Sequence, residues 1–435
     1  MAYLNHSVKY LCCNKLNSQS LWKAVNAISE TKSATFTITQ GRQRTLFAEL
    51  IAHTKCRSLC MPQQNSCSIL MGYGDVSRTF SSSSKEKTHK FDPNQESRRQ
   101  KLLLLTYLSG FIGTCLLCAI GFRQYSAFVR RAQGIEELHV REYGRRPHLF
   151  RYRGYVLPAY IINNIKAIHT FDVREDDIWV VSFPKAGTTW LQEIVYLIVN
   201  NGNFEAASQT NIDERFPYFE FIVPGMKAIS QMPSPRLIKS HLPLSLLPNQ
   251  ITQKKPKVIY IARNPKDTVV SYYNFITKFL TELEITFSGT FETFCQLFVD
   301  DLVYYGPWWK HVKEAWDKRD DENVLVLFYE DLHIDPHKTV QDIALFLGRP
   351  VSKGVVDAIV KHCSFESMKS NKSVNYDWLK SGEIARKDES FLRKVLITGQ
   401  VGDWKNHLSV DISQKLDGIV ATKLAPAGAP IRDSI

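Results

Sequence analysis

The loop from Pro184 to Trp190 combines the residue types that bind an anion. Gly187 lets the backbone approach a phosphate, Thr188 and Thr189 supply hydroxyl donors, and Lys185 adds a compact positive charge. The loop joins an apolar run to a helical pattern, where backbone N–H groups and the helix dipole favour an anion. The alternative is an ordinary strand-to-helix turn with a threonine cap. We predict a phosphate site here.

The position of the lysine argues against a Walker A loop. That motif places its lysine after the second glycine, next to a Ser or Thr that holds magnesium, whereas Lys185 precedes Gly187. A nucleotide or small-molecule kinase stays open as an alternative, because the run Val324–Phe328 ends in Tyr329-Glu330-Asp331, as a magnesium-binding strand does. A requirement for magnesium in group transfer would indicate a kinase.

Two more groups of polar residues follow apolar runs. Arg263 stands after one run and Ser271 lies in the next helical pattern, so a guanidinium fork and a hydroxyl can bind one phosphate. The alternative for Arg263 is a surface ion pair with Asp267. Lys239 and His241 stand at the end of another run. The ordinary pKa of histidine suits proton transfer at neutral pH, although a histidine near a loop is more often structural.

The elements that must position these residues are short apolar, β-branched runs separated by helical patterns such as Trp190–Val199. Alternating strands and helices predict an α/β fold, with a parallel sheet and helices on both faces. Ligand sites in such sheets gather at the carboxyl ends of the strands. The predicted strands are Asp177–Phe183, Arg236–Ser240, Lys257–Ala262 and Val324–Phe328.

The segment Phe183-Pro184-Lys185-Ala186-Gly187-Thr188-Thr189-Trp190 resembles the donor loop of the cytosolic-type sulfotransferase family, and the resemblance extends over roughly Tyr152–Leu424. It implies an α/β, P-loop-like parallel sheet and the donor 3′-phosphoadenosine 5′-phosphosulfate. The implied reaction is in-line transfer of a sulfuryl group to a phenol or alcohol hydroxyl of a small molecule, without a metal. The resemblance makes His241 the general base; Lys185 stabilises the leaving phosphate oxygen and Lys239 assists at the transferring group.

The resemblance also distributes the binding residues. Arg263 and Ser271 are implied to bind the 3′-phosphate, and Cys363 stands where the family often has threonine. Phe183, Tyr218 and Phe221 are implied to line the acceptor site, with plain core packing as the alternative for Tyr218 and Phe221. The implied donor contacts are Lys185, Ala186, Gly187, Thr188, Thr189, Trp190, Arg263, Ser271, Tyr329, Cys363, Phe365, Arg393, Lys394 and Gly399.

The C-terminal donor segment departs from the family pattern. Val395–Thr398 stands as an insertion between Arg393-Lys394 and Gly399. Misplacing positioning groups by about 1 Å can cost on the order of 100-fold in rate, so we expect reduced donor affinity. A membrane-tethered nucleotide-binding protein without turnover is therefore a second alternative, which a His241→Ala comparison distinguishes from an enzyme.

The family's dimer segment is also altered. It corresponds to Lys405, Ser409, Val410 and Gln414, where Ser replaces Thr and Gln replaces Glu. A homodimer through this segment is therefore uncertain.

The net charge of +12 lies entirely in the N-terminal third, because residues 1–150 hold 21 Lys and Arg against 9 Asp and Glu. The remainder is balanced, so we expect no nucleic-acid partner. Seven of the nine cysteines precede residue 120. Cys295 and Cys363 form neither a disulfide framework nor a metal-ligand spacing, which suits a reducing compartment.

The chain is expected to begin with a leader and an anchor. Residues 1–101 are basic and Ser-rich, and Arg78-Thr79-Phe80 resembles a mitochondrial processing site, with a disordered polar leader as the alternative. Residues 102–122 carry no charge and are long enough to span a membrane core of about 30 Å. We expect a single-pass membrane protein, mitochondrial or on a cytoplasm-facing membrane, with a linker at 123–151, the catalytic domain at 152–424 and a tail at 425–435.

Overall fold

The central element of the fold is a four-stranded parallel sheet. A computed structural model describes residues 93–144, 149–221, 225–279, 287–376 and 401–433, all within the second of two units, Asp92–Ile435. The strand order is β5-β4-β6-β7, and every neighbouring pair is parallel. The predicted parallel α/β sheet is confirmed. Its strands are β4 (Ile178–Val181), β5 (Leu237–Ser240), β6 (Lys257–Ala262) and β7 (Val324–Phe328).

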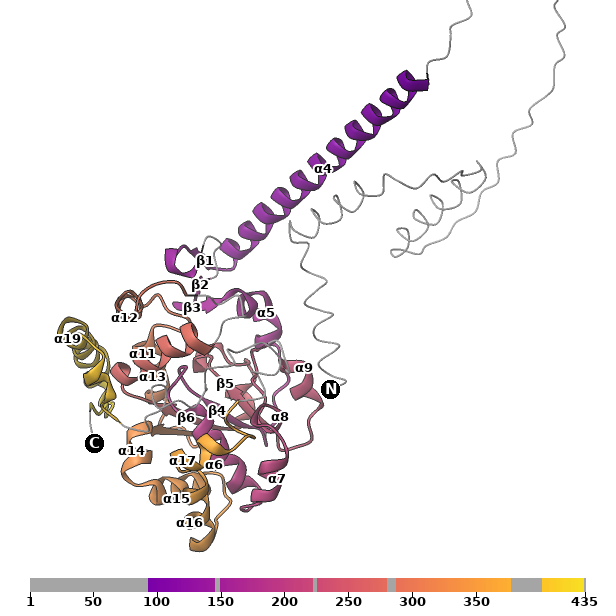
Figure 1. Ribbon diagram of the computed structural model, residues 1–435. Helices are drawn as coiled ribbons and strands as arrows, with labels where there is room; N and C mark the ends of the chain where they lie inside the picture. Colours follow the sequence, from indigo (N-terminus) through magenta and orange to yellow (C-terminus); the bar gives the residue numbers. More distant parts are fainter. Residues whose placement is uncertain (1–92, 145–148, 222–224, 280–286, 377–400, 434–435) are drawn as a thin grey trace, which may run out of the picture. The chain divides into compact units, whose positions relative to one another are not determined.

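Alternate residues of the strands face opposite layers of helices. Trp179 and Val181 of β4 belong to one buried cluster, whereas Ile178 and Val180 belong to the other. This two-residue period follows from the strand pleat, and burial on both faces explains the continuous apolar runs. Figure 1 shows the helices on both sides of the sheet.

The helices divide between these two clusters. The first cluster takes side chains from α5 (Ala159–His169), α9 (Gly225–Gln231), α10 (Ile251–Lys254), α11 (Pro265–Asn274), α12 (Phe291–Val299), α13 (Trp308–Trp316) and α19 (Val410–Ile419). The second takes side chains from α6 (Thr188–Val199), α7 (Phe204–Gln209), α8 (Ile212–Arg215), α14 (Tyr329–Ile334), α15 (Pro336–Phe346), α16 (Lys353–His362) and α17 (Phe365–Ser370).

The predicted membrane segment lies within one long helix, α4 (Pro93–Ala132). Its part from Ser97 to Ala132 has a mean hydropathy of 2.1 in its most apolar stretch, none of which is buried. Length and composition suit a membrane span, and the anchor stays a prediction. Residues 1–92, with the predicted processing site, lie outside the described part.

Residues 123–151 differ from the expected linker. They hold the end of α4, then β1 (Ile135–Leu138) and most of β2 (Leu149–Tyr152), which forms an antiparallel sheet with β3 (Tyr155–Pro158). These strands are short, with buried residues such as Ile135 and Leu149. A strand of this length leaves an apolar pattern in the sequence that is too brief to be recognised.

The C-terminal tail also has defined contacts. Trp316 Nε1 donates to the carbonyl of Ala427 at 2.8 Å, and Arg432 pairs with Asp331 at 2.9 Å. Asn264 Nδ2 donates to the Arg432 carbonyl at 2.7 Å and to Asp433 Oδ1 at 2.8 Å. The segment therefore packs on the α/β domain, although the sequence predicts a tail at 425–435.

Candidate active site

The predicted phosphate loop connects β4 to α6, as the sequence predicts. Gly187 precedes the helix with φ of 102° and Lys185 has φ of 71°, both in the left-handed region. A Cβ added at Gly187 would lie 2.6 Å from Tyr329 Cδ2. Only glycine fits this close approach without displacing the tyrosine. Ser182 Oγ and Thr188 Oγ1 lie 2.6 Å apart and form a hydrogen bond across the loop.

Three cationic side chains act on one another at this loop. Burial and the charges of Lys239 and Arg263 lower the pKa of Lys185 to about 7. The Lys185 ammonium also lies 4.5 Å from the ring centroid of Phe275. Burial likewise lowers the pKa of Lys239. Such depressed pKa values are typical of sites built to receive a negative charge.

Arg263 follows β6 and is 6% exposed. Its Nη1 donates to the Lys185 carbonyl at 3.4 Å, and its guanidinium lies 4.3 Å above the ring of Tyr329. Its buried Nε has no hydrogen-bond partner among the described residues. Because a buried donor without a partner is costly, this nitrogen fits an anionic ligand. Ser271 is 4% exposed on the following helix α11.

The considered ion pair between Arg263 and Asp267 is not formed in the described part of the chain. The Asp267 carboxylate instead accepts hydrogen bonds from the backbone N–H groups of Gly402 and Trp404, at 2.9 and 3.0 Å. Among the described residues, Arg263 therefore forms no ion pair with a carboxylate, which is consistent with the predicted anion site.

His241 stands after β5, and its imidazole reaches the phosphate loop. Its Nδ1 lies 2.8 Å from the carbonyl of Ser182 and 3.3 Å from Ser182 Oγ. A carbonyl only accepts hydrogen bonds, so Nδ1 carries the proton and neutral Nε2 is an acceptor. Burial, followed by the charge of Lys239, lowers the pKa of His241 well below its ordinary value. The imidazole is therefore neutral at pH 7.

Aromatic rings surround the His241 imidazole. Tyr218 and Tyr305 lie edge-on to it, with ring centroids 5.2 and 5.8 Å away. Phe221 stacks on Tyr218 at 5.6 Å, and Tyr160 contacts Phe221 edge-on at 5.8 Å. Two hydroxyl contacts join the tyrosines, 2.6 Å between Tyr218 and Tyr305 and 3.0 Å between Tyr160 and Tyr305. Tyr160 and Tyr305 were not predicted, because nothing local in the sequence distinguishes them from core residues.

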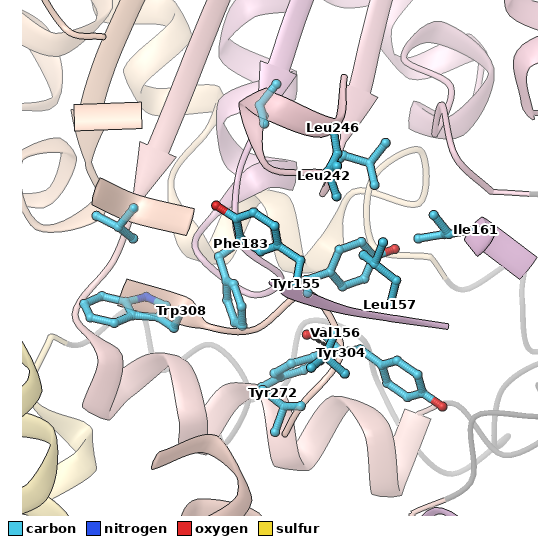
Figure 2. Close-up of a cluster of buried hydrophobic side chains, with 14 of the residues drawn as sticks. Tyr155, Val156, Leu157, Ile161, Phe183, Leu242, Leu246, Tyr272, Tyr304 and Trp308 are labelled. Carbon is cyan, nitrogen blue, oxygen red and sulfur yellow. Dashed lines mark hydrogen bonds between the residues drawn. The ribbon is translucent and has the colours of Figure 1, made fainter. Parts of the chain in front are cut away.

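Phe183 lies apart from these rings in the buried core. Its ring contacts Tyr272, Phe298 and His311 edge-on, at 5.7, 5.9 and 5.7 Å. Figure 2 shows it among other apolar side chains of the same cluster, including Tyr155 and Tyr272. Its predicted contact with an acceptor stays a prediction.

Three of the expected donor contacts, which are Trp190, Tyr329 and Phe365, lie on α6, α14 and the start of α17. Trp190 contacts Tyr329 at 5.5 Å and His333 at 4.7 Å between ring centroids. Phe365 begins α17 and is half-buried. Cys363 is 2% exposed, and burial, with the nearby Glu193 charge, raises the pKa of its thiol.

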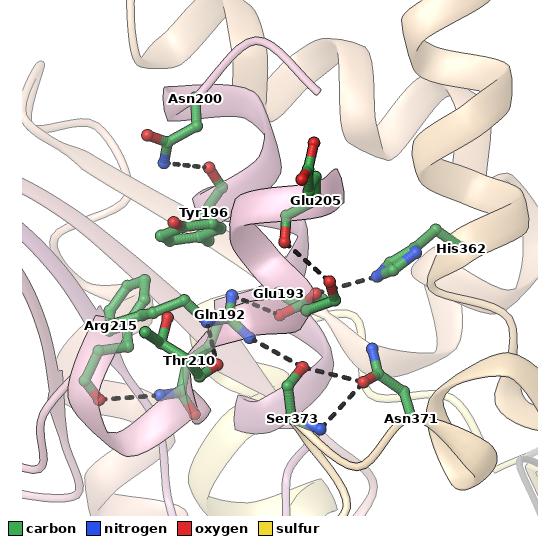
Figure 3. A network of polar contacts seen from close by, with 12 residues as sticks. Gln192, Glu193, Tyr196, Asn200, Glu205, Thr210, Arg215, His362, Asn371 and Ser373 are labelled. Atoms are coloured by element: carbon green, nitrogen blue, oxygen red, sulfur yellow. Dashed lines mark hydrogen bonds and ion pairs between the residues drawn. The ribbon is translucent and has the colours of Figure 1, made fainter. Parts of the chain in front are cut away.

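A buried polar network holds α6 against the segment that carries Phe365. Glu193 accepts from His362 Nε2 at 3.0 Å and pairs with Arg215 at 2.9 Å (Figure 3). Arg215 also donates to the carbonyl of Thr210 at 3.1 Å. This network was not predicted, because its members come from distant parts of the chain.

The remaining predicted donor residues, Arg393, Lys394 and Gly399, lie outside the described residues, as does the insertion Val395–Thr398. No group of three or more His, Cys, Asp or Glu side chains suits a metal ion in the described ranges.

Glu330, which motivated the kinase alternative, is fully buried and accepts from the Asn264 backbone N–H at 2.9 Å.

Comparisons with known proteins identify the family of the chain. The sulfotransferase domain family matches residues 175–428. Sulfotransferase 1E1 of Bos taurus is 42% identical over 267 residues, which are 60% of this chain and 88% of the relative. Sulfotransferase 1A1 of Rattus norvegicus is 40% identical over 276 residues, which are 62% of this chain and 92% of the relative.

Two solved structures are also similar. Retinol dehydratase in complex with androsterone and the inactive cofactor PAP has a TM-score of 0.60 and 27% identity, covering 68% of this chain and 97% of its own. Its complex with retinol and PAP has a TM-score of 0.61 and 27% identity, covering 68% and 98%.

Proposed function

Because this chain belongs to the sulfotransferase family and is a sulfotransferase enzyme, we propose that it sulfates a hydroxyl of an apolar small molecule with His241 as the general base. The donor is 3′-phosphoadenosine 5′-phosphosulfate, consistent with the PAP-bound relatives. The acceptor loses a proton as its oxygen bonds to sulfur. The products are a sulfate ester and PAP, which is adenosine 3′,5′-bisphosphate.

The observation that carries the proposal is the hydrogen bond from His241 Nδ1 to the Ser182 carbonyl, at 2.8 Å. This bond fixes the tautomer, so that the lone pair of Nε2 receives the acceptor proton. The lowered pKa keeps the imidazole unprotonated before reaction. A general base must be unprotonated at the working pH to act.

The donor fits the cationic end of the site. The loop from Lys185 to Trp190, with its helix N-terminus, is proposed to bind the 5′ side of the donor, and Lys185 to stabilise the leaving oxygen. Arg263, with its Nε donor unoccupied among the described residues, and Ser271 are proposed to bind the 3′-phosphate. Trp190, Tyr329 and Phe365 are proposed to lie around adenine.

The acceptor is proposed to be an apolar alcohol or phenol. Tyr218, Phe221, Tyr305 and Tyr160 form a mainly aromatic surface beside His241. Aromatic side chains bind flat or apolar molecules through large contact areas. The similar retinol dehydratase was solved with retinol and with androsterone, which both belong to this class.

The setting is proposed to be a membrane. The exposed apolar helix from Ser97 to Ala132 supports a single-pass anchor. An anchor would hold the enzyme where apolar alcohols concentrate.

The test is sulfate transfer from ³⁵S-labelled donor to a panel of phenols and alcohols, with the full chain and with His241→Gln. We expect His241→Gln to lower kcat by at least about 1000-fold while PAP affinity stays within about twofold. His337→Gln, at an exposed histidine, is the matched control. A wild-type protein that binds PAP but never transfers sulfate would support the binding-protein alternative, and transfer from ATP with magnesium would support the kinase.

A further inference from the structure

The main chain of His241 is held from two sides. Its backbone N–H donates to Glu220 Oε1 at 2.6 Å. Its carbonyl lies 3.0 Å from Nε2 of His311, a histidine on α13 with no exposed surface. His311 takes no part in the proposed reaction, yet it hydrogen-bonds to His241, which is the proposed general base.

The proton positions on His311 follow from its two partners. The His241 carbonyl only accepts, so His311 Nε2 carries the proton. His311 Nδ1 then accepts from the hydroxyl of Tyr260, at 2.7 Å. Burial lowers the pKa of His311 to about 4, so one neutral tautomer holds across the working pH range.

These bonds form a chain that reaches back to the phosphate loop. Tyr260 donates to His311, His311 donates to the His241 carbonyl, and His241 Nδ1 donates to the Ser182 carbonyl. Tyr260 lies within β6, His241 directly follows β5, and Ser182 directly follows β4, so the chain links β6 and α13 to the ends of two strands. The first two bonds share the His311 imidazole and polarise each other in a buried site, whereas the third starts from the His241 side chain.

We propose that His311 and Tyr260 are positioning residues that fix the place of the His241 imidazole relative to the phosphate loop. The inference rests on the proposed function, because it concerns the same base. Neither side chain is among the proposed reactant contacts. His311 acts through the backbone of His241, and Tyr260 acts through His311 and through its hydrogen bond with the Phe183 backbone. A displacement of a reacting group by about 1 Å can cost on the order of 100-fold in rate.

The experiment compares two buried tyrosines beside His311, of which only Tyr260 belongs to the chain of hydrogen bonds. Tyr260→Phe removes the hydroxyl that binds His311. Tyr155→Phe removes the part-buried hydroxyl of a buried tyrosine, which donates to Glu314 at 2.7 Å while the ring packs edge-on against His311 at 6.3 Å. We expect Tyr260→Phe to lower kcat by about 10- to 100-fold with PAP affinity unchanged, and Tyr155→Phe to lower it less than about threefold.

His311 supplies the second pair of variants. His311→Gln keeps an N–H group within reach of the His241 carbonyl, whereas His311→Leu keeps only volume. We expect the kcat of His311→Gln to be at least about tenfold higher than the kcat of His311→Leu. The acid limb of the kcat profile, which reports the His241 pKa, should shift in His311→Leu and return toward wild type in His311→Gln.

Thermal unfolding of every variant separates positioning from loss of fold. Equal kcat values for Tyr260→Phe and Tyr155→Phe, or for His311→Leu and His311→Gln, in folded proteins would overturn the inference. Losses confined to PAP affinity would overturn it too. Full activity of His241→Gln would instead overturn the proposed function, so the two failures are distinct.

Discussion

The carboxylate of Asp267 accepts the backbone N–H of Trp404 at 3.0 Å, and it binds the N–H of Gly402 at 2.9 Å as well. Asp267 stands four residues after Arg263 in the sequence. The carboxylate therefore anchors the described end of the C-terminal donor segment next to the proposed 3′-phosphate site.

Replacing Asp267 with alanine should weaken PAP binding. The change leaves the part-buried N–H groups of Gly402 and Trp404 without their acceptor and releases the segment that begins at Val401, which we expect to raise the PAP Kd by about tenfold. Isothermal titration of PAP measures it. Asp317→Ala, at an exposed carboxylate paired with Lys313, should leave the Kd unchanged; equal effects from the two variants would contradict the anchoring role.

Gly187→Ala should abolish donor binding and destabilise the fold. The new Cβ would meet the Tyr329 ring at 2.6 Å and would force alanine into a φ of 102°. Such backbone strain costs on the order of 1–3 kcal/mol of unfolding free energy. Urea unfolding and PAP titration measure the two effects.

The control for that change is Gly418→Ala in α19, where a Cβ meets nothing within 4 Å. Because alanine is the better helix former, we expect a gain of roughly 0.5–1 kcal/mol there. A loss of PAP binding in Gly418→Ala would show that the PAP titration responds to general changes in folding and is not specific to the phosphate loop.

PAP affinity should fall as pH rises above 7. The folded, ligand-free protein holds Lys185 with a pKa of about 7, and an anion binds better to the protonated ammonium. Binding then takes up a proton above pH 7, so Kd should rise by up to about tenfold per pH unit until the pKa of the complex is reached. Lys185→Met should bind PAP more weakly and lose most of this slope; an unchanged slope would assign it to other groups, such as Glu330.

The same lysine affects the stability of the free protein. Its folded pKa lies below its ordinary value of 10.5, so the unfolded chain binds more protons between pH 7 and 10.5. The contribution of Lys185 to the unfolding free energy should therefore rise with pH across that window. The difference between wild type and Lys185→Met, measured by urea unfolding at pH 7 and pH 9, checks the sign.

Glu193→Gln should destabilise the domain. The change removes a fully buried carboxylate and leaves Arg215 buried without its anion. Breaking a buried pair from one side costs about 3–5 kcal/mol, which urea unfolding measures. Glu205→Gln, on the exposed side of α7, should lie within about 0.5 kcal/mol of wild type. A comparable loss in the two variants would contradict the role of the buried network.

The sequence predicts the parallel sheet well because burial on both faces leaves continuous apolar runs, as in Lys257–Ala262. It also predicts the loop around Gly187, whose chemistry is local. It does not predict Tyr305, His311 or the Glu193 network, since their partners come from distant segments that only folding brings together. The strands before Tyr152 are missed for another reason: each is four residues long and interrupted by charges such as Glu136.

The packed C-terminal segment has a consequence for handling this enzyme. Asp433 lies 3.5 Å from the Lys266 ammonium and accepts from Trp404 Nε1 through its carbonyl, at 3.2 Å. Residues close to the C-terminus thus meet the same corner that Asp267 anchors. We therefore expect trimming by a carboxypeptidase past Asp433, or a bulky tag fused directly after Ile435, to raise the PAP Kd in the same direction as Asp267→Ala.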